Sequence, residues 1–116
     1  MNSLGVIGGL GPMATEYLLE LITDMTDART DQEHLDAIIF NRPSVPDRTA
    51  YILDHTKPSP VPPMIDIAQK LEALGVCALA TPCVTAHSFH DELQSSVHIP
   101  FIPVSYTHLT LPTIRL

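Results

Sequence analysis

The segment LGVIGGLGPMAT, residues 4–15, predicts a strand, a tight turn and the beginning of a helix. Its apolar run ends in the glycines of GGLGP, and Pro12 suits the first helical position because an N–H there would have no partner. Apolar residues then repeat at helical spacing as far as Met25. A strand followed closely by a turn and a helix is typical of the α/β class.

The rest of the chain continues this alternation. Further strands are expected at residues 35–40, 76–81 and 99–104, and further helices at 49–53, 62–74 and 85–95. We therefore predict the α/β fold class, with an open parallel sheet of about four strands and helices on both faces. Asp47 would cap the first of these helices, and the proline-rich segment Asp54–Pro63 would form an ordered loop or lid. Ligands of such sheets bind at the carboxyl ends of the strands, so the segments that follow the strands form the candidate site.

Composition and charge exclude several classes of protein. With 116 residues, 45% hydrophobic and 16% charged, the chain suits one globular domain and not a disordered segment. Its net charge of −7 has the wrong sign for binding nucleic acid. It has no apolar run of the ~20 residues that span a bilayer and no basic, apolar leader, so we expect no membrane partner and a cytoplasmic location.

The two cysteines are expected to differ in role. If Cys77 and Cys83 lie on one extended segment, they are about 20 Å apart, too far for a disulfide. Cys77, within the strand, is expected in the apolar core. Cys83 stands in TPCVTAH at a strand-to-helix turn and would contribute little packing. Unpaired N–H groups at the helix start would favour its thiolate and, with the Thr85 hydroxyl, could hold a carboxylate. The alternative is a buried, unreactive Cys83.

The glycine turn has two interpretations. Gly9, Gly11 and Ala14 match the loose dinucleotide pattern GxGxxA, but the second strand ends in Phe40 and Asn41 where that pattern needs an acid. No lysine follows the glycines, so the phosphate-binding Walker pattern also fails. What remains is a turn whose backbone can approach a small ligand closely, or a turn that merely packs.

Arg48, in the segment PDRT, follows the second strand and therefore belongs to the same edge of the sheet as Gly9 and Cys83. A guanidinium group pairs well with a carboxylate because it presents parallel N–H donors. The alternative is a surface ion pair between Arg48 and Asp47 or Asp54.

Cys83, His87 and His90 repeat at about one-turn spacing on the expected helix, which raises the possibility of a zinc site. The chain lacks a second cluster with the spacing of known zinc sites, so we expect no metal. His87 would instead tune or orient the site around Cys83, or cap and pack.

The segment Ser105–Leu116, SYTHLTLPTIRL, differs from the rest of the chain because it contains no acid and begins where another helix should start. It resembles translated sequencing-adapter read-through, which would make the chain a truncated gene product. The alternative is a native, frayed C-terminus. We therefore expect an α/β half-domain at residues 1–104 and a tail at residues 105–116 that is non-native or disordered.

Several segments, taken together and in order, resemble one family. They are GVIGGLGPMAT, DQEH before the second strand, PDRT after it, and PCVTAHSFHDEL followed by IPFIPV. This set resembles the aspartate/glutamate racemases of the wider aspartate/glutamate/hydantoin racemase group, over residues 4–104. The resemblance implies the N-terminal half of a two-domain racemase that acts on a small acidic amino acid. It further implies a reaction without pyridoxal phosphate or another cofactor, and a homodimer for the full-length protein.

The resemblance also implies a role for each matching residue. One cysteine thiolate removes the α-proton of aspartate or glutamate, an opposing cysteine delivers a proton to the other face, and Cys83 matches the first of these. Arg48 would hold one substrate carboxylate, and Thr85 with the backbone around Val84 would hold the other. The floor of the site would be lined by Gly9, Gly11 and Met13.

Two features depart from the family pattern. Val84 stands where many members have asparagine, which leaves the choice of amino acid open. The second half, with the second cysteine and a lysine that meets the substrate, is missing, so we expect residues 1–116 to be inactive alone. The alternative function, from a different class, is a small-ligand or nucleotide-binding α/β module that uses the GGLGP loop.

Overall fold

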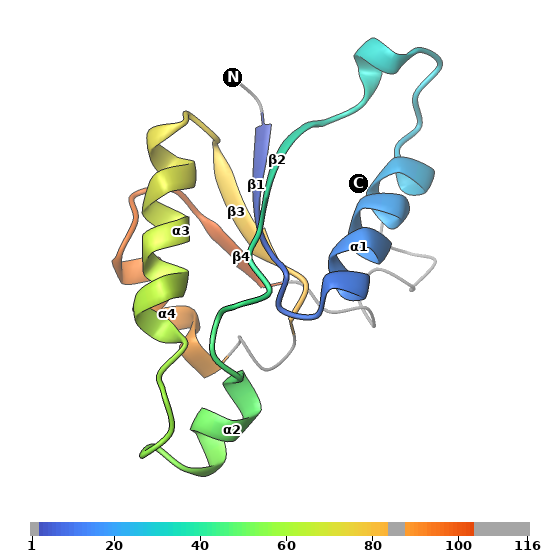
Figure 1. Cartoon of the computed structure of the whole chain (residues 1–116). Coiled ribbons are helices and arrows are strands. Elements are labelled where there is room, and N and C mark those ends of the chain that lie inside the picture. Colours follow the sequence, from blue (N-terminus) through green and yellow to red (C-terminus); the bar gives the residue numbers. More distant parts are fainter. Residues whose placement is uncertain (1–2, 84–87, 104–116) are drawn as a thin grey trace.

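A parallel sheet forms the centre of the structure (Figure 1). The computed structural model describes residues 3–83 and 88–103. Within them, four parallel strands are hydrogen-bonded in the order β2-β1-β3-β4. The strands are β1 (Ser3–Gly8), β2 (Asp36–Asn41), β3 (Ala78–Thr81) and β4 (Phe101–Pro103). The predicted open parallel sheet is confirmed, and the strand that contains proline lies at an edge, where its missing N–H leaves no partner unsatisfied.

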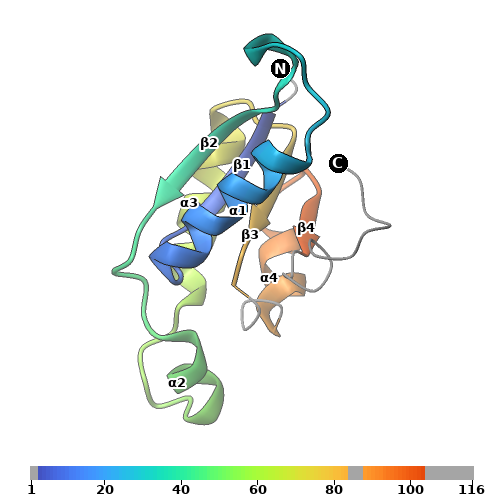
Figure 2. The same cartoon turned by 90° about the vertical axis from the view of Figure 1, so that its right-hand side faces the viewer.

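Helices cover both faces of this sheet, as predicted. The helical elements are α1 (Pro12–Met25), the 3-10 turn η1 (Asp31–Glu33), α2 (Arg48–Leu53), α3 (Val61–Ala73) and α4 (His90–Ser95). Helix α1 lies against one face, over β1 and β2, while α3 and α4 lie against the other (Figures 1 and 2). Helix α2 stands beyond the carboxyl ends of the strands (Figure 1).

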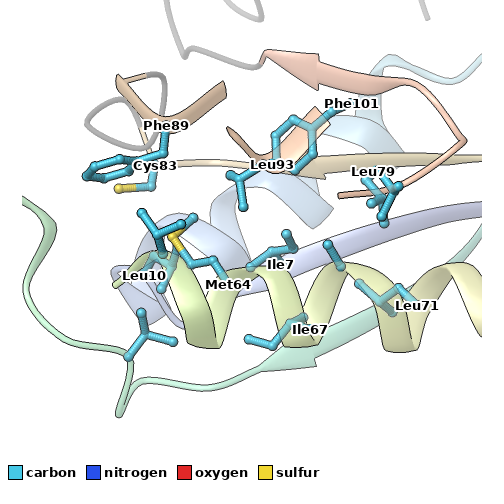
Figure 3. Close-up of a cluster of buried hydrophobic side chains, with 14 of the residues drawn as sticks. Ile7, Leu10, Met64, Ile67, Leu71, Leu79, Cys83, Phe89, Leu93 and Phe101 are labelled. Carbon is cyan, nitrogen blue, oxygen red and sulfur yellow. The ribbon is translucent and has the colours of Figure 1, made fainter. Parts of the chain in front are cut away.

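Two apolar clusters, one on each face, hold the helices to the sheet. Side chains alternate along β1, so Ile7 faces α3 whereas Val6 faces α1 and packs with Leu18. On the α3 face several side chains are completely buried, each contributing about 1.5–3 kcal/mol of burial free energy. They include Met64, Ile67, Leu71, Leu79 and Leu93 (Figure 3). The α3 face is therefore the principal core, and Cys83 is one of its members.

Several element boundaries follow from local signals in the sequence. Helix α1 begins at Pro12, as expected. Asp47 caps α2, its carboxylate accepting a hydrogen bond from the Ala50 N–H at 3.1 Å. Helix α3 is followed by Gly75 with φ of +95°, a conformation that favours glycine. The proline-rich loop is shorter than expected, because α3 already begins at Val61.

Cys77 is exposed, and the expectation of a core position was wrong. The strand β3 begins only at Ala78, because its pairing with β1 starts at Leu4 and its pairing with β4 at Leu79. Cys77 therefore stands at the amino end of β3, where its N–H and its thiol both donate to the Ser3 carbonyl, at 2.9 Å and 3.1 Å.

Helix α4 is shorter than predicted among the described residues. It begins at His90, and Ser88 and Phe89 precede the α-helix instead of belonging to it. The expected helix start near Thr85 lies outside the described residues, as does the predicted tail at 105–116. Within residues 3–83 and 88–103, no helix has the length and apolar character needed to cross a membrane.

Candidate functional site at the ends of the strands

The carboxyl ends of β1, β2 and β3 meet at one edge of the sheet, and the chain segments that leave them form what we call the strand-end edge, residues 8–11, 41–48 and 81–83 (Figures 1 and 2). Two hydrogen bonds tie these segments together. The Arg42 N–H donates to the Gly8 carbonyl at 2.9 Å, and the Thr81 hydroxyl donates to the Ile7 carbonyl at 2.9 Å. The glycine turn, Arg48 and Cys83, predicted as site residues, therefore belong to one edge.

Thr15 holds the glycine turn in shape. Its hydroxyl accepts a hydrogen bond from the Gly9 N–H at 3.0 Å and donates to the Gly11 carbonyl at 3.5 Å. Thr15 is buried and lies near the start of α1. Sequence reasoning missed this residue, although a polar side chain inside the helical repeat directly after the glycines was an available signal.

The two glycines of the turn have different surroundings. Gly9 has φ of +89°, and a Cβ there would lie 2.6 Å from backbone atoms of Arg42 and Pro43. Gly11 has φ of +84°, but a Cβ there would meet only the Ala14 methyl at 3.6 Å. Position 9 thus requires glycine because the backbone of Arg42 and Pro43 lies directly against it. At Gly9 this agrees with the interpretation of a turn that merely packs. Gly11 is exposed to solvent, and so is Met13, whose side chain is 75% exposed.

Cys83 is a member of the principal core rather than an exposed turn residue. It is 9% exposed and shares its cluster with Leu10, Val45, Met64 and Phe89. In Figure 3 its sulfur lies beside the Phe89 ring, above Leu10 and Met64. The expectation that Cys83 contributes little packing was therefore wrong. Its burial agrees with the unreactive alternative, whereas its place at the strand-end edge agrees with a catalytic role.

Cys83 and Cys77 lie at opposite ends of β3. The strand Ala78–Thr81 separates them, and no disulfide joins one to the other. This confirms the expectation that the two are not disulfide partners. It also leaves Cys83 as the cysteine of the strand-end edge.

Arg48 is the first residue of α2, and its guanidinium group folds back onto the preceding loop. Nη1 donates to the carbonyls of Val45 and Pro46, each at 3.4 Å. Nε is buried and has no hydrogen-bond partner among the described residues. A buried donor in this state costs roughly 1–3 kcal/mol unless a water, an ion or a ligand accepts a hydrogen bond from it.

The alternative partners of Arg48 are engaged elsewhere. The Asp47 carboxylate accepts from the Ala50 N–H, as the cap of α2. The Asp54 carboxylate accepts from the hydroxyl and the N–H of Thr56, and these hydrogen bonds hold the pKa of Asp54 below its ordinary value. Among the described residues Arg48 forms no ion pair with either acid. The surface ion-pair interpretation is therefore not supported.

Three predicted site residues, Val84, Thr85 and His87, lie outside the described residues. His90 is described, and its ring packs edge-on against Phe101 with Nε2 3.2 Å from the Phe101 carbonyl. Within the described ranges, no group of three or more His, Cys, Asp or Glu side chains is placed to hold a metal ion.

The parallel sheet has the strand order β2-β1-β3-β4 and carries a glycine turn, an arginine and a cysteine at its carboxyl edge. This is an open α/β fold, a class whose small-molecule ligands bind at the carboxyl ends of the strands. Residues 7–105 match the sequence model of the Asp/Glu/hydantoin racemase family. The chain belongs to that family.

Individual relatives agree with this assignment. The chain is 29% identical over 105 residues to the broad specificity amino-acid racemase RacX of Bacillus subtilis, covering 87% of the chain and 45% of RacX. Its fold resembles that of the aspartate racemase of Picrophilus torridus, with a TM-score of 0.79 and 33% identity, over 89% of the chain and 43% of that protein. It also resembles an aspartate racemase homologue of Pyrococcus horikoshii OT3, with a TM-score of 0.71 and 21% identity, over 89% of the chain and 45% of that protein. The chain thus spans less than half the length of these relatives.

Proposed function

We propose that this chain contributes one half of the active site of an amino-acid racemase that acts without pyridoxal phosphate on aspartate, glutamate or a close acidic analogue. Family membership supports racemisation, and the relatives named above include an aspartate racemase and a racemase of broad specificity. In this proposal Cys83 transfers a proton at one face of the substrate Cα. The opposing thiol comes from outside residues 1–116, and the complete protein is a cytoplasmic homodimer.

The observation that carries the proposal is the state of the Arg48 guanidinium. Nη1 is held by two carbonyls of its own loop, which fixes the plane of the group. Nε, on the edge away from Nη1, is buried without a partner among the described residues. A carboxylate that displaced the groups covering this edge would satisfy Nε and form a charge-assisted pair. An acidic substrate supplies such a carboxylate.

The proposed chemistry follows from the placement of Cys83 and Arg48 at one edge. The α-proton moves from the substrate to the Cys83 thiolate, and the electron pair of the C–H bond delocalises into the α-carboxylate. The second thiol then protonates the planar carbanion from the opposite face, which inverts the configuration. Arg48 holds a carboxylate during both steps, with Thr85 and the backbone at Val84 holding the other. His87 orients the site, and the open part of the turn at Gly11 and Met13, with Gly9 behind it, forms the floor.

The nucleotide-binding alternative is not favoured. The N–H of Gly9 already donates to the Thr15 hydroxyl, so it does not point to a phosphate. The space beside the Gly9 Cα is filled by the backbone of Arg42 and Pro43. The turn therefore lacks the open row of backbone donors that a phosphate cradle requires.

The reactivity of the two cysteines tests the role of Cys83. Exposure alone predicts that iodoacetamide alkylates the exposed Cys77 before the buried Cys83. We expect the reverse order, because a catalytic Cys83 is the more nucleophilic of the two thiols. We also expect millimolar aspartate to slow the alkylation of Cys83 and not that of Cys77. Mass spectrometry of the two cysteine peptides over time measures both rates.

Cys77 is the matched control in the same molecule, since it reports any general effect of aspartate on the reagent or the fold. Faster labelling of Cys77, together with equal rates in the presence and absence of aspartate, would identify Cys83 as an unreactive core cysteine. The proposed function would then be wrong.

Replacing Arg48 tests the carboxylate contact. We expect Arg48→Gln to raise the aspartate concentration that half-protects Cys83 by about 10–100-fold, the loss of a charge-assisted pair. Arg48→Lys should restore part of the protection, because it keeps the charge but not the fork of donors. Arg42→Gln is the control, as Arg42 lies at the same edge and faces Asp66 at 3.7 Å. If Arg42→Gln and Arg48→Gln weaken protection equally, the effect is general charge and Arg48 has no specific role.

A further inference from the structure

We infer that Tyr51 is a positioning residue that fixes Arg48 relative to Cys83 through the ring of Phe89. This inference rests on the proposed function, because the position of Arg48 relative to Cys83 matters only if both groups bind the same substrate. It concerns an aromatic contact that lies outside the substrate-binding set described above.

Helix α2, which carries Arg48, has little of its own to hold it in place. None of its residues is buried, and it stands away from the sheet at the strand-end edge (Figures 1 and 2). A helix as short as Arg48–Leu53 is not stable by itself in water, so its orientation depends on the contacts it makes. Val45, just before it, is buried in the principal core, and Tyr51 within it packs against that core.

The Tyr51 ring is held between two other rings. Its centroid lies 6.1 Å from that of Phe89 at an interplanar angle of 47°, and 4.7 Å from that of His55 in an edge-on arrangement. Both separations lie in or near the range at which ring pairs attract. Tyr51 therefore occupies a defined position between its own helix end and the segment that follows Cys83.

Phe89 connects this contact to the thiol. Phe89 is 5% exposed and belongs to the same cluster as Cys83, with its ring beside the sulfur in Figure 3. Arg48 and Tyr51 are three residues apart on one helix, which places them on neighbouring positions of the same side. A shift of the Tyr51 ring would thus move the guanidinium group relative to Cys83.

The expected consequence is a change in ligand binding without a change in the thiol itself. A misplacement of about 1 Å in a binding group can lower its effect on a reaction by up to about a hundredfold. Cys83 remains packed against Phe89, Leu10 and Met64 when Tyr51 is truncated, so its own reactivity should hold. This split between ligand affinity and thiol reactivity distinguishes positioning from a general loss of structure.

The experiment uses residues 1–116 with Tyr51→Ala, Tyr51→Leu and Tyr51→Phe, with Ile52→Ala as the matched control. Ile52 is the next residue of the same helix and its side chain is 37% exposed. Aspartate is the probe, and Cys83 alkylation by iodoacetamide is the readout. We expect Tyr51→Ala and Tyr51→Leu to raise the half-protecting aspartate concentration about tenfold or more. The alkylation rate without aspartate should stay within about twofold of the wild-type rate. Tyr51→Phe and Ile52→Ala should resemble the wild type.

Hydrogen exchange supplies a second, independent readout. The amides of Tyr51 and Asp54 donate to the Asp47 and Ala50 carbonyls at 3.3 Å and 2.9 Å, and their exchange reports whether α2 stays docked. Tyr51→Leu should speed their exchange, and Ile52→Ala should not. Unchanged protection in Tyr51→Ala and Tyr51→Leu, together with unchanged exchange in Tyr51→Leu, would overturn the inference. If aspartate fails to protect even the wild type, the proposed function is wrong, and the exchange rates alone decide whether Tyr51 fixes α2.

Discussion

Residues 1–116 alone should leave the enantiomers of aspartate and glutamate uninverted. Inversion needs a proton acceptor at one face of the Cα and a proton donor at the other, and the strand-end edge of this chain carries one thiol, Cys83, among its described residues. Losing one positioned proton-transfer group lowers a rate by about 10²–10⁴-fold. At most, Cys83 would exchange the Cα proton slowly and with retention.

Cys77 cannot supply the missing proton. It stands at the amino end of β3, tied to the Ser3 carbonyl, whereas Cys83 follows the carboxyl end of that strand. The four residues of β3, at about 3.3 Å each, lie between them, so more than about 10 Å separates the two cysteines. A substrate Cα in contact with Cys83 is therefore out of reach of Cys77.

Chiral chromatography of L-aspartate, D-aspartate and both glutamates, incubated with the purified chain, measures inversion, and proton NMR in heavy water measures exchange at Cα. The aspartate racemase of Picrophilus torridus serves as the positive control. Inversion at an enzyme-like rate that disappears in Cys83→Ala would contradict the proposal of a missing half. A rate that rises with the square of the protein concentration would mean that a second copy supplies the opposing thiol.

Gly9→Ala should destabilise the fold severely. The φ of +89° at Gly9 is one that residues with a Cβ rarely adopt, and the new methyl would lie 2.6 Å from backbone atoms of Arg42 and Pro43. Backbone atoms cannot swing aside as a flexible side chain can. Strain at such a φ and overpacking each cost about 1–3 kcal/mol, so we expect the free energy of unfolding to fall by about 3 kcal/mol or more. For a single domain this is a large part of its total stability.

Gly11→Ala is the control for this prediction. Gly11 has a similar φ of +84°, but a Cβ there has room, with the Ala14 methyl at 3.6 Å. Only the backbone strain remains, so Gly11→Ala should cost about 1–3 kcal/mol. Urea unfolding followed by circular dichroism compares the two variants. Equal losses at both positions would show that the contact with residues 42 and 43 contributes nothing.

Sequence reasoning was most successful where the signal is local. Pro12 at the start of α1 and Asp47 at the cap of α2 act within one turn of their own helix, so their roles can be recognised without knowing the fold. The parallel sheet likewise follows from strands that alternate with helices. These features are sufficient to assign the glycine turn, Arg48 and Cys83 to one edge of the sheet.

What the sequence did not reveal depends on contacts between distant segments. The exposure of Cys77 follows from where β3 begins to pair with β1 and β4, and the burial of Cys83 follows from the Phe89 and Met64 side chains that pack on it. An apolar stretch of sequence predicts neither the exposure of Cys77 nor the burial of Cys83. The same holds for position 9, which requires glycine because Arg42 and Pro43, at the end of β2, lie against it.

The contact between Gly9 and the backbone of Arg42 and Pro43 also limits how this edge can be redesigned. The loop that starts at Arg42 leads directly to Arg48. The glycine turn (residues 8–11) and this loop (residues 41–48) are therefore packed together as one unit. A designer who wishes to transplant a different specificity into this scaffold would have to exchange residues 8–11 and 41–48 together, as one cassette. Exchanging either loop alone would put the new one into the space of the other.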